Sequence, residues 1–336
     1  MSGKVGNQTI AITRKVIIRN RACIVSKKEK AGPLGEFFDQ VEDEKFEEET
    51  WEKAESKFMK STYSKLVTSC NITDQDVDCI LSGDLLNQCM ATGFALKDTG
   101  RPIIGLYGAC STMAESTAIG ALLVDGGGFN NVVCMTSSHY CSAEKQFRGP
   151  LELGTQRAPT SQWTVTGSGG IILSSEGDGP VITNVTLGKI LDFNIADSNN
   201  MGAAMAPSAA STIITHLKDT GRVPDYYDLI VTGDLGIYGR QLCEKIMQEE
   251  GVHFTQNRYK DCGELIFDPL VQDTHAGGSG CGCSAVVLTG YLLDMMQKKQ
   301  INRLLFVATG ALMSPTSVKQ GVPILGVAHA IAIENV

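Results

Sequence analysis

Cys110 is the residue whose type and position point most directly to chemistry. It lies in the stretch GACST (residues 108–112), between an apolar run and a helical pattern, so we expect it in the first turn of a helix. Unpaired N–H groups at a helix N-terminus stabilise anions, which favours either a thiolate nucleophile or a bound carboxylate at this position. The alternative is a buried cysteine that packs as a small apolar side chain.

A second group of small residues surrounds Cys281 and Cys283, in the stretch HAGGSGCGC (residues 275–283). Its glycines predict a tight turn that a ligand can approach closely. A Cys-x-Cys pair beside His275 is compatible with zinc, but a closed zinc site needs four ligands and only one such pair is present. We therefore predict no metal site and interpret this turn as a pocket wall.

Five polar residues near predicted turns are further candidates. His139 and His329 lie near strand ends and are candidate pocket residues, although a single histidine is more often structural. Arg148 lies on the polar segment after His139, where it can either neutralise an acidic ligand or belong to a solvated loop. Asp84 and Asp234 occupy matching Gly-Asp turns, for which helix N-capping is the simpler explanation.

The elements that would position these residues follow a regular alternation. We expect a helix from about residue 50 to 70, then strands and helices in a βαβαβ order, which implies a mostly parallel sheet covered by helices. The predicted strands are 79–81, 103–107, 132–136, 163–173 and 181–187, and the predicted helices between them are 85–96 and 111–123.

Four stretches recur in the same order in the second part of the chain, at similar offsets, which indicates an internal duplication. The alternative is that all α/β units look alike. The pairs are 78–88 with 228–239, 108–123 with 280–296, 131–138 with 303–310, and 166–176 with 326–334. Under this duplication, the turn at Cys281 corresponds to the turn at Cys110 and should face it.

Composition excludes several classes of function. The net charge of −8 and the lack of a Lys/Arg cluster argue against nucleic-acid binding. The 11 cysteines are odd in number and irregularly spaced, which indicates buried thiols in a reducing compartment rather than a disulfide framework. The N-terminus lacks the apolar core of a signal peptide, and no apolar run reaches the ~18 residues that a membrane span needs.

The chain resembles the thiolase superfamily and, within it, the stage V sporulation protein AD family of endospore-forming bacteria. The resemblance runs from residue 28 to 334 through these stretches: KEKAGPLGEFFD, SGDLLNQ, LYGACSTMAES, SSHYCSAEKQFR, VTGSGG, DSNNMGAAMAP, TGDLG, AGGSGCGCSAVV and VATGALMSPT. It implies an α/β fold of the thiolase-like, duplicated αβαβα type, with five layers and two mostly parallel mixed sheets. The halves would be residues 1–180, which carry Cys110, and residues 181–336.

The resemblance also shows a departure from the enzymes of this superfamily. Those enzymes pair the nucleophilic cysteine with two histidines, or with a histidine and an asparagine, on turns that face it. Here the turn TGDL (232–235) has no histidine, and the turn GCGC (280–283) has neither residue. A nucleophile needs a base within hydrogen-bonding reach, so the resemblance implies the fold more firmly than the reaction.

The resemblance therefore implies a sporulation protein that binds dipicolinic acid (pyridine-2,6-dicarboxylate), free or as its calcium chelate, for uptake into the developing spore without turnover. We expect no cofactor, with calcium only as part of the ligand. One alternative is an acyltransferase of the thiolase or β-ketoacyl synthase type with Cys110 as nucleophile, and another is a structural protein with a vestigial pocket. The expected ligand-binding residues are Cys110, His139, Arg148, Asp84, Asp234, Cys281 and His329.

Partners follow from the same resemblance. We expect other proteins of the spore membrane channel complex, and a homodimer formed through a sheet-edge strand near residues 131–136. The expected location is the cytoplasmic face of the forespore or spore inner membrane, with attachment through protein partners.

Overall fold

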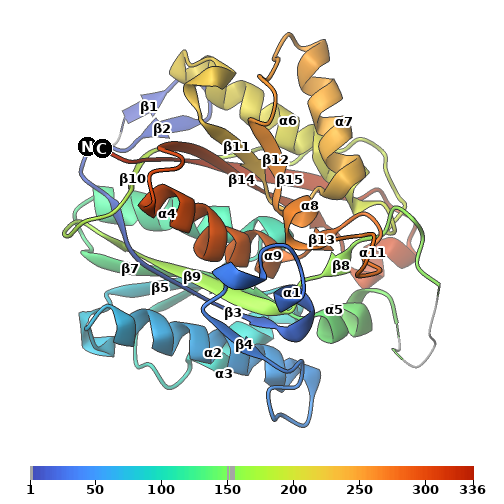
Figure 1. Ribbon diagram of the computed structural model, residues 1–336, viewed down its shortest axis with the longest axis horizontal. Coiled ribbons are helices and arrows are strands. Elements are labelled where there is room, and N and C mark those ends of the chain that lie inside the picture. The colour runs from blue at the N-terminus through green and yellow to red at the C-terminus, as the bar shows by residue number, and fades with distance from the viewer. Residues whose placement is uncertain (1–2, 150, 152–155) are drawn as a thin grey trace.

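The computed structural model describes residues 3–149, 151 and 156–336 (Figure 1). Its α-helices are α1(Lys27–Lys30), α2(Trp51–Ser69), α3(Met90–Leu96), α4(Thr112–Asp125), α5(Tyr140–Phe147), α6(Met201–Thr220), α7(Gly236–Glu249), α8(Cys262–Ile266), α9(Cys281–Val286), α10(Leu293–Gln297) and α11(Pro315–Lys319). Its strands are β1(Gly3–Val5), β2(Thr9–Ala11), β3(Ile17–Ser26), β4(Gln40–Glu42), β5(Cys79–Gly83), β6(Ile103–Gly105), β7(Asn131–Ser138), β8(Trp163–Thr164), β9(Gly167–Ser174), β10(Val181–Thr186), β11(Leu229–Thr232), β12(Tyr259–Asp261), β13(Gly278–Ser279), β14(Arg303–Leu312) and β15(Leu325–Glu334).

Five layers stack along one direction (Figure 1). Helices α2 and α3 cover the outer face of one group of strands, and α6 and α7 cover the outer face of the other. Helices α4 and α9 lie between the two groups, and α4 packs against β7 on one side and β15 on the other. Side chains such as Met113 and Val286 fill this central layer and are fully buried. Burial of these apolar helix faces is the main source of stability.

The strand order repeats between the halves. In the first half the order is β6-β5-β7-β9-β3, and in the second it is β12-β11-β14-β15-β10. In each set the first three strands are parallel to one another, and the next two pairings are antiparallel. The structure thus confirms the duplicated thiolase-like α/β fold, with mixed sheets in which the parallel strands carry the crossover helices.

The two sets of strands meet at a narrow seam. Their only direct register partners among the described residues are Val181 of β10 and Ile17 of β3. The hairpin formed by β1 and β2 belongs by sequence to the first half, yet β2 pairs with β10 of the second. The boundary at residue 180 stays a prediction, and the hairpin crosses it.

Two of the expected elements are interrupted. The expected helix 85–96 begins with the 3-10 turn η3(Asn87–Cys89), where Gln88 and Cys89 have φ of 56° and 51°, and only α3 is regular. The expected strand 163–173 divides into β8 and β9, because β8 leaves the main sheet to pair with β13. This small parallel pair joins the two halves next to the pocket described below.

The prediction that the strand near residues 131–136 lies at a sheet edge is wrong. Strand β7 is covered by β5 on one side and β9 on the other, so it has no free edge for a second copy. The edge of the first half is β6, in which Ile103 and Ile104 are 37% and 44% exposed. In the part of the chain that the structure describes, no helix is long and apolar enough to cross a bilayer.

Candidate functional site

Cys110 lies between β6 and α4, in the 3-10 turn η4(Ala109–Ser111). Ala109 has a φ of 50°, a left-handed conformation that a residue with a side chain seldom adopts. The turn closes through the Ser111 N–H, which donates to the Gly108 carbonyl at 3.0 Å. Gly310 of β14 lies against it, since a Cβ there would be 2.2 Å from the Gly108 oxygen. The second half therefore supports the turn that presents Cys110.

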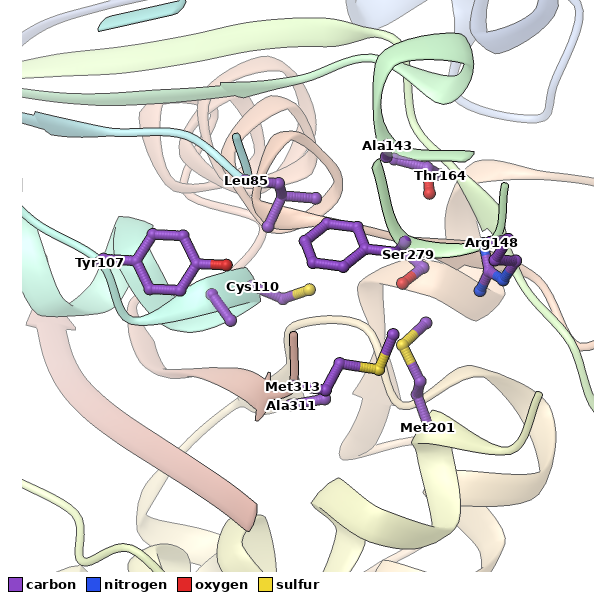
Figure 2. Close-up of a pocket in the computed structure, with 12 residues that line it drawn as sticks. Leu85, Tyr107, Cys110, Ala143, Arg148, Thr164, Met201, Ser279, Ala311 and Met313 are labelled. Carbon is purple, nitrogen blue, oxygen red and sulfur yellow. The ribbon is translucent and has the colours of Figure 1, made fainter. Parts of the chain in front are cut away.

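A small pocket opens at Cys110, with a volume of about 30 Å³. Figure 2 shows Tyr107 and Arg148 at opposite ends, with the Cys110 sulfur between them and the thioethers of Met201 and Met313 below. Both halves contribute to the wall, which consists of Leu85, Tyr107, Ala109, Cys110, Ala143, Phe147, Arg148, Thr164, Met201, Ser279, Ala311 and Met313. The pocket is mostly apolar, with one cation.

Arg148 is that cation. It lies in the pocket wall, which is compatible with the interpretation that it neutralises an acidic ligand. It is the C-cap of α5, and its side chain is 19% exposed. One guanidinium nitrogen pairs with Glu144 one turn earlier, whereas the buried Nε has no hydrogen-bond partner among the described residues. A buried, unpaired N–H next to a pocket carries a desolvation cost that an anionic ligand would offset.

Asp234 lies behind the pocket and is fully buried. Its carboxylate accepts hydrogen bonds from Thr309 Oγ1 at 2.7 Å, the Gly280 N–H at 2.9 Å and Ser279 Oγ at 3.2 Å. The Asp234 carboxylate is also near enough to Cys110 to raise the pKa of its thiol. Burial raises the pKa of Asp234 above its usual range, and these donors act in the opposite direction.

This arrangement affects the ionisation of Cys110. Burial raises the pKa of its thiol well above the usual range, and the nearby Asp234 carboxylate and Cys281 add to the effect. The favourable field of the helix N-terminus is outweighed, because desolvation and a like charge both disfavour a thiolate.

Cys281 opens α9 and faces the pocket region from the second half, as the duplication predicted. Its thiol donates to the Ser137 carbonyl at 2.9 Å. Leu85, Cys110, Ala143 and Cys281 pack together in one apolar cluster. Burial raises the pKa of Cys281 well above its usual range. Cys281 is a packed thiol next to Cys110 and is not one of the pocket-lining residues.

The two matching aspartates differ in function. Asp84 caps its own helical segment as the simpler explanation predicted, since it accepts from the Leu86 N–H at 2.9 Å and the Thr92 N–H at 2.8 Å. Asp234 does not cap α7. Asp261 does so in its place, accepting from the Leu235 and Gly236 N–H groups at 2.9 and 2.8 Å. Capping of the helix that follows it was therefore the wrong explanation for Asp234, whose carboxylate instead accepts from the Gly280 N–H at the start of α9.

Neither candidate histidine is placed among the pocket-lining residues. His139 is the N-cap of α5, where Nδ1 accepts from the Cys141 N–H at 3.1 Å and Nε2 donates to the Glu44 carbonyl at 2.7 Å. His329 pairs with Ala308 across β14 and β15, and its Nδ1 accepts from the Gly188 N–H at 3.1 Å. Burial lowers the pKa of both, that of His329 to about 4, so both are neutral structural residues.

The turn at His275 holds no metal-binding cluster. His275 pairs with Asp273 at 3.1 Å on the surface. The described residues contain no group of three or more histidine, cysteine or acidic side chains that could hold a metal ion. The Cys281 and Cys283 thiols point into packed apolar surroundings instead.

Sequence reasoning missed the apolar part of the pocket. Tyr107, Phe147, Met201 and Met313 carry no motif of their own, although each lies inside a stretch that supported the family resemblance. Two of them are direct neighbours of a candidate residue or of its turn. Proximity in sequence to Gly108 and Arg148 was the one signal that could have found Tyr107 and Phe147.

Comparison with known proteins agrees with this geometry. The thiolase-like architecture matches 3-oxoacyl-[acyl-carrier-protein] synthase III from Aquifex aeolicus VF5 (TM-score 0.59, 10% identity, 96% of this chain and 100% of that one). It also matches human mitochondrial 3-ketoacyl-CoA thiolase (TM-score 0.56, 10% identity, 97% of this chain and 100% of that one). At such identities the likeness concerns the fold alone.

The sequence relatives are more specific. The chain is 40% identical over 331 residues to stage V sporulation protein AD of Bacillus subtilis (strain 168), which covers 98% of this chain and 97% of that protein. The family model for stage V sporulation protein AD (SpoVAD) matches residues 6–334. The chain therefore belongs to the stage V sporulation protein AD family, on a thiolase-like fold.

Proposed function

We propose that this chain is a sporulation protein that binds dipicolinic acid in the pocket at Cys110, for uptake into the developing spore, without catalytic turnover. The observation that carries the proposal is the Arg148 guanidinium, which is largely buried in the pocket wall with its Nε–H unpaired among the described residues. Family membership supports the role in sporulation.

The pocket chemistry suits a small, flat dianion. One carboxylate would pair with Arg148, near the hydroxyl groups of Thr164 and Ser279, while the pyridine ring would pack against Phe147 and Met313. Because the whole chain has a net charge of −8, long-range attraction cannot gather an anion here. Recognition must come from these short-range contacts, or from a calcium chelate that carries less charge.

The size of the pocket implies that ligand entry moves side chains. A volume of about 30 Å³ is small, whereas an engineered cavity that binds benzene measures about 150 Å³. Met201 and Met313 form much of one wall, and methionine side chains are unbranched and repack readily. We infer that these two residues and Phe147 shift when the ligand enters.

The absence of turnover rests on the state of Cys110. An acyltransferase of the thiolase or β-ketoacyl synthase type needs a thiolate or a base that generates one. Here burial, with a further contribution from the nearby Asp234 carboxylate, raises the pKa of the Cys110 thiol. A binding role needs no such activation.

Titration calorimetry with dipicolinate, with and without calcium, tests the proposal. We expect saturable binding that weakens when Arg148 is changed to Gln and when pyridine-2-carboxylate replaces the dicarboxylate. Lack of binding at millimolar dipicolinate in both conditions contradicts the proposal. A covalent adduct on Cys110 after incubation with acyl-coenzyme A, followed by its turnover, would favour the acyltransferase instead.

We also propose a homodimer through the edge strand β6 and attachment to the cytoplasmic face of the forespore or spore inner membrane through other proteins of the channel complex. The exposed Ile103 and Ile104 on an unpaired edge support pairing with a second copy. Light scattering tests the dimer: Ile104→Glu should yield a monomer, and an unchanged mass would argue against pairing through β6.

A further inference from the structure

We propose that an open stretch at the edge of β3 is the docking site for an extended, acidic segment of a partner protein, which adds there as a further strand. The groove beside this edge is lined in part by the C-terminal Val336. Figure 1 shows that end of the chain far from α5 and β8, which line the pocket at Cys110. The inference goes beyond the proposed function and does not rest on dipicolinate binding.

Strand β3 leaves part of one edge unpaired. On its other edge it pairs with β9 over nearly its whole length. On the edge in question, Ile17 pairs with Val181 of β10, and Ile24–Ser26 pairs with β4. Residues 19–22, between these two contacts, have no strand beside them on this edge in the part of the chain that the structure describes.

Arg21 supplies the free backbone groups of this edge. Along an antiparallel pair, alternate residues direct their N–H and C=O groups toward the partner strand and away from it. The Cys23 N–H points away from β9, since it donates to Asp39 Oδ2 at 2.8 Å. The N–H and C=O groups of Arg21, two residues earlier, point the same way, and among the described residues they have no backbone partner outside the ladder. An incoming strand therefore meets one donor and one acceptor.

The corresponding edge of the second half is closed. There β10 occupies the position that β3 occupies in the first half. Directly after the seam, the Ile12 N–H donates to the Thr183 carbonyl at 2.9 Å, and β2 then pairs with residues 184–186. The chain thus covers one of the two equivalent edges with a strand of its own and leaves the other open. An unpaired edge is a template for a strand from another chain.

A groove of about 720 Å³ lies along the open residues. It is lined by residues 18–21 of β3, by Lys65 of α2, and by Met296 and Lys299 at and beyond the end of α10. The groove is far larger than the pocket at Cys110, and it follows the edge of a strand. An extended segment is the occupant that suits this shape.

The charge of the groove favours an acidic occupant. Its cationic side chains are Lys15, Arg19, Arg21, Lys65 and Lys299. Among the described residues only Arg21 of this set forms an ion pair, with Asp294. Asp39, Asp178 and the C-terminal carboxylate of Val336 offset part of the charge, yet the groove stays positive in a chain with a net charge of −8. Complementary charge selects an acidic segment and disfavours a basic one.

Fluorescence anisotropy with labelled, capped peptides tests this charge preference. The acidic probe repeats Glu-Glu-Thr-Thr over about eight residues, which places carboxylates on both faces of an extended chain. The matched probe has lysine in place of glutamate. We expect saturable binding of the acidic probe below about 1 mM, and at least about tenfold weaker binding of the lysine probe. Lack of binding in this range, or equal binding of both probes, overturns the proposal.

Charge reversal in the groove locates the binding site. The double variant Lys65→Glu/Lys299→Glu should bind the acidic probe about tenfold more weakly, because it replaces two attractions by two repulsions. Lys189→Glu/Lys245→Glu is the matched control, since it changes the net charge equally at exposed lysines outside the groove. Thermal unfolding shows whether both variants fold. Equal losses in the two folded variants would assign the effect to long-range charge and overturn the proposal.

Hydrogen exchange of single amides, followed by NMR, tests whether the segment adds as a strand. At saturation with the acidic probe, the Arg21 amide should exchange at least about tenfold more slowly, because it gains an acceptor. The Cys23 amide is the internal control, since it already donates to Asp39, and its exchange should not change. A bound probe with unchanged exchange at Arg21 would show contact through side chains alone and overturn strand addition.

Two other occupants of the groove have distinct outcomes. Displacement of the probe by an equal concentration of inorganic phosphate would identify a site for small anions and reject the proposal. A lower mass by light scattering for Lys65→Glu/Lys299→Glu than for the unaltered protein would identify a second copy of the chain and also reject it. None of these measurements involves dipicolinate, so failure of this proposal and failure of the proposed function are seen separately.

Discussion

Asp84 and Asp234 occupy the same turn in the two halves, yet their carboxylates serve different partners. Asp84 accepts from N–H groups of its own segment, and Asp234 accepts from Thr309, Ser279 and Gly280 behind the pocket. The difference depends on Asp261, which caps α7. Because Asp261 caps α7, the Asp234 carboxylate can bind partners outside the helical segment that follows it.

Arg148→Gln should weaken dipicolinate binding by about 10- to 100-fold, since a charge-assisted hydrogen bond contributes about 1.5–3 kcal/mol. Calorimetry gives the dissociation constants. Arg240→Gln is the matched control, because Arg240 also pairs with a glutamate one turn away, Glu244 at 2.8 Å, but on α7. Equal losses in the two variants would indicate a general electrostatic effect and reject Arg148 as a ligand contact.

Gly310→Ala should destabilise the turn at Cys110 and reduce dipicolinate binding. The new Cβ would meet the Gly108 oxygen at 2.2 Å, so either β14 or the turn must move; we expect a loss of about 1–3 kcal/mol in unfolding free energy. Gly93→Ala in α3 is the control, because a Cβ there meets nothing within 4 Å. Urea unfolding should show Gly93→Ala gaining up to about 1 kcal/mol.

A Gly310→Ala protein with unaltered stability and unaltered affinity would show that the contact with Gly108 relaxes without consequence. In that case β14 does not support the Cys110 turn.

Glu55→Gln should make stability depend less on pH between about 5 and 8. Glu55 of α2 accepts from Ser137 Oγ at 3.2 Å and Ser142 Oγ at 2.5 Å, and burial, with a further contribution from Asp84, raises its pKa to about 8. The folded state holds the proton more tightly than the unfolded state. The stability that this proton contributes is therefore fully present below the pKa of Glu55 in the unfolded state. It is lost as the pH rises through the pKa of Glu55 in the folded state.

Urea unfolding across this pH range measures the effect. A single group of this kind changes stability by at most about 1.4 kcal/mol per pH unit. In the Glu55→Gln protein, the plot of unfolding free energy against pH should lack the part of the slope that Glu55 contributes. If both proteins show the same slope, Glu55 titrates near its ordinary value in the folded protein.

Asp261→Asn should lower the unfolding free energy by about 1–3 kcal/mol. The new NH₂ group is a donor, so it cannot accept the hydrogen bond of the backbone N–H that it faces. Both oxygens of Asp261 are occupied, by the Leu235 N–H on one side and the Gly236 and Gly263 N–H groups on the other. Asp192→Asn is the control, since among the described residues exposed Asp192 accepts only from the Asn194 N–H. Equal midpoints for the two variants would contradict a capping role for Asp261.

The fold could largely be predicted from the sequence. Repeats in the same order defined the duplication. The strands that these repeats form occupy corresponding positions in the two halves: β5 matches β11, β7 matches β14, and β9 matches β15. The edge strand could not be predicted, because strand order depends on which crossover packs beside which. The apolar stretches 79–83, 103–105 and 131–138 look alike in sequence, whether or not they form an edge strand.

The site could be predicted in part. The turn and helix start placed Cys110, and the duplication placed Cys281 opposite. Arg148 was found through its charge, but the apolar wall has no chemical signature. His139 and His329 do not line the pocket at Cys110, and a histidine that accepts one backbone N–H is indistinguishable in sequence from one that binds a ligand. The ionisation of Cys110 depends on burial and on Asp234, which no local pattern encodes.

The hairpin of β1 and β2 has a consequence for how the molecule assembles. A polypeptide divided near residue 180 would keep this hairpin on the fragment that does not contain its sheet, because β2 pairs with β10. The sheet of the second fragment would then present an unpaired edge at β10 until the first fragment supplied this strand. The two fragments should therefore associate when they are expressed together. The duplicated halves are interleaved through this strand, so the second half depends on the first to complete its sheet.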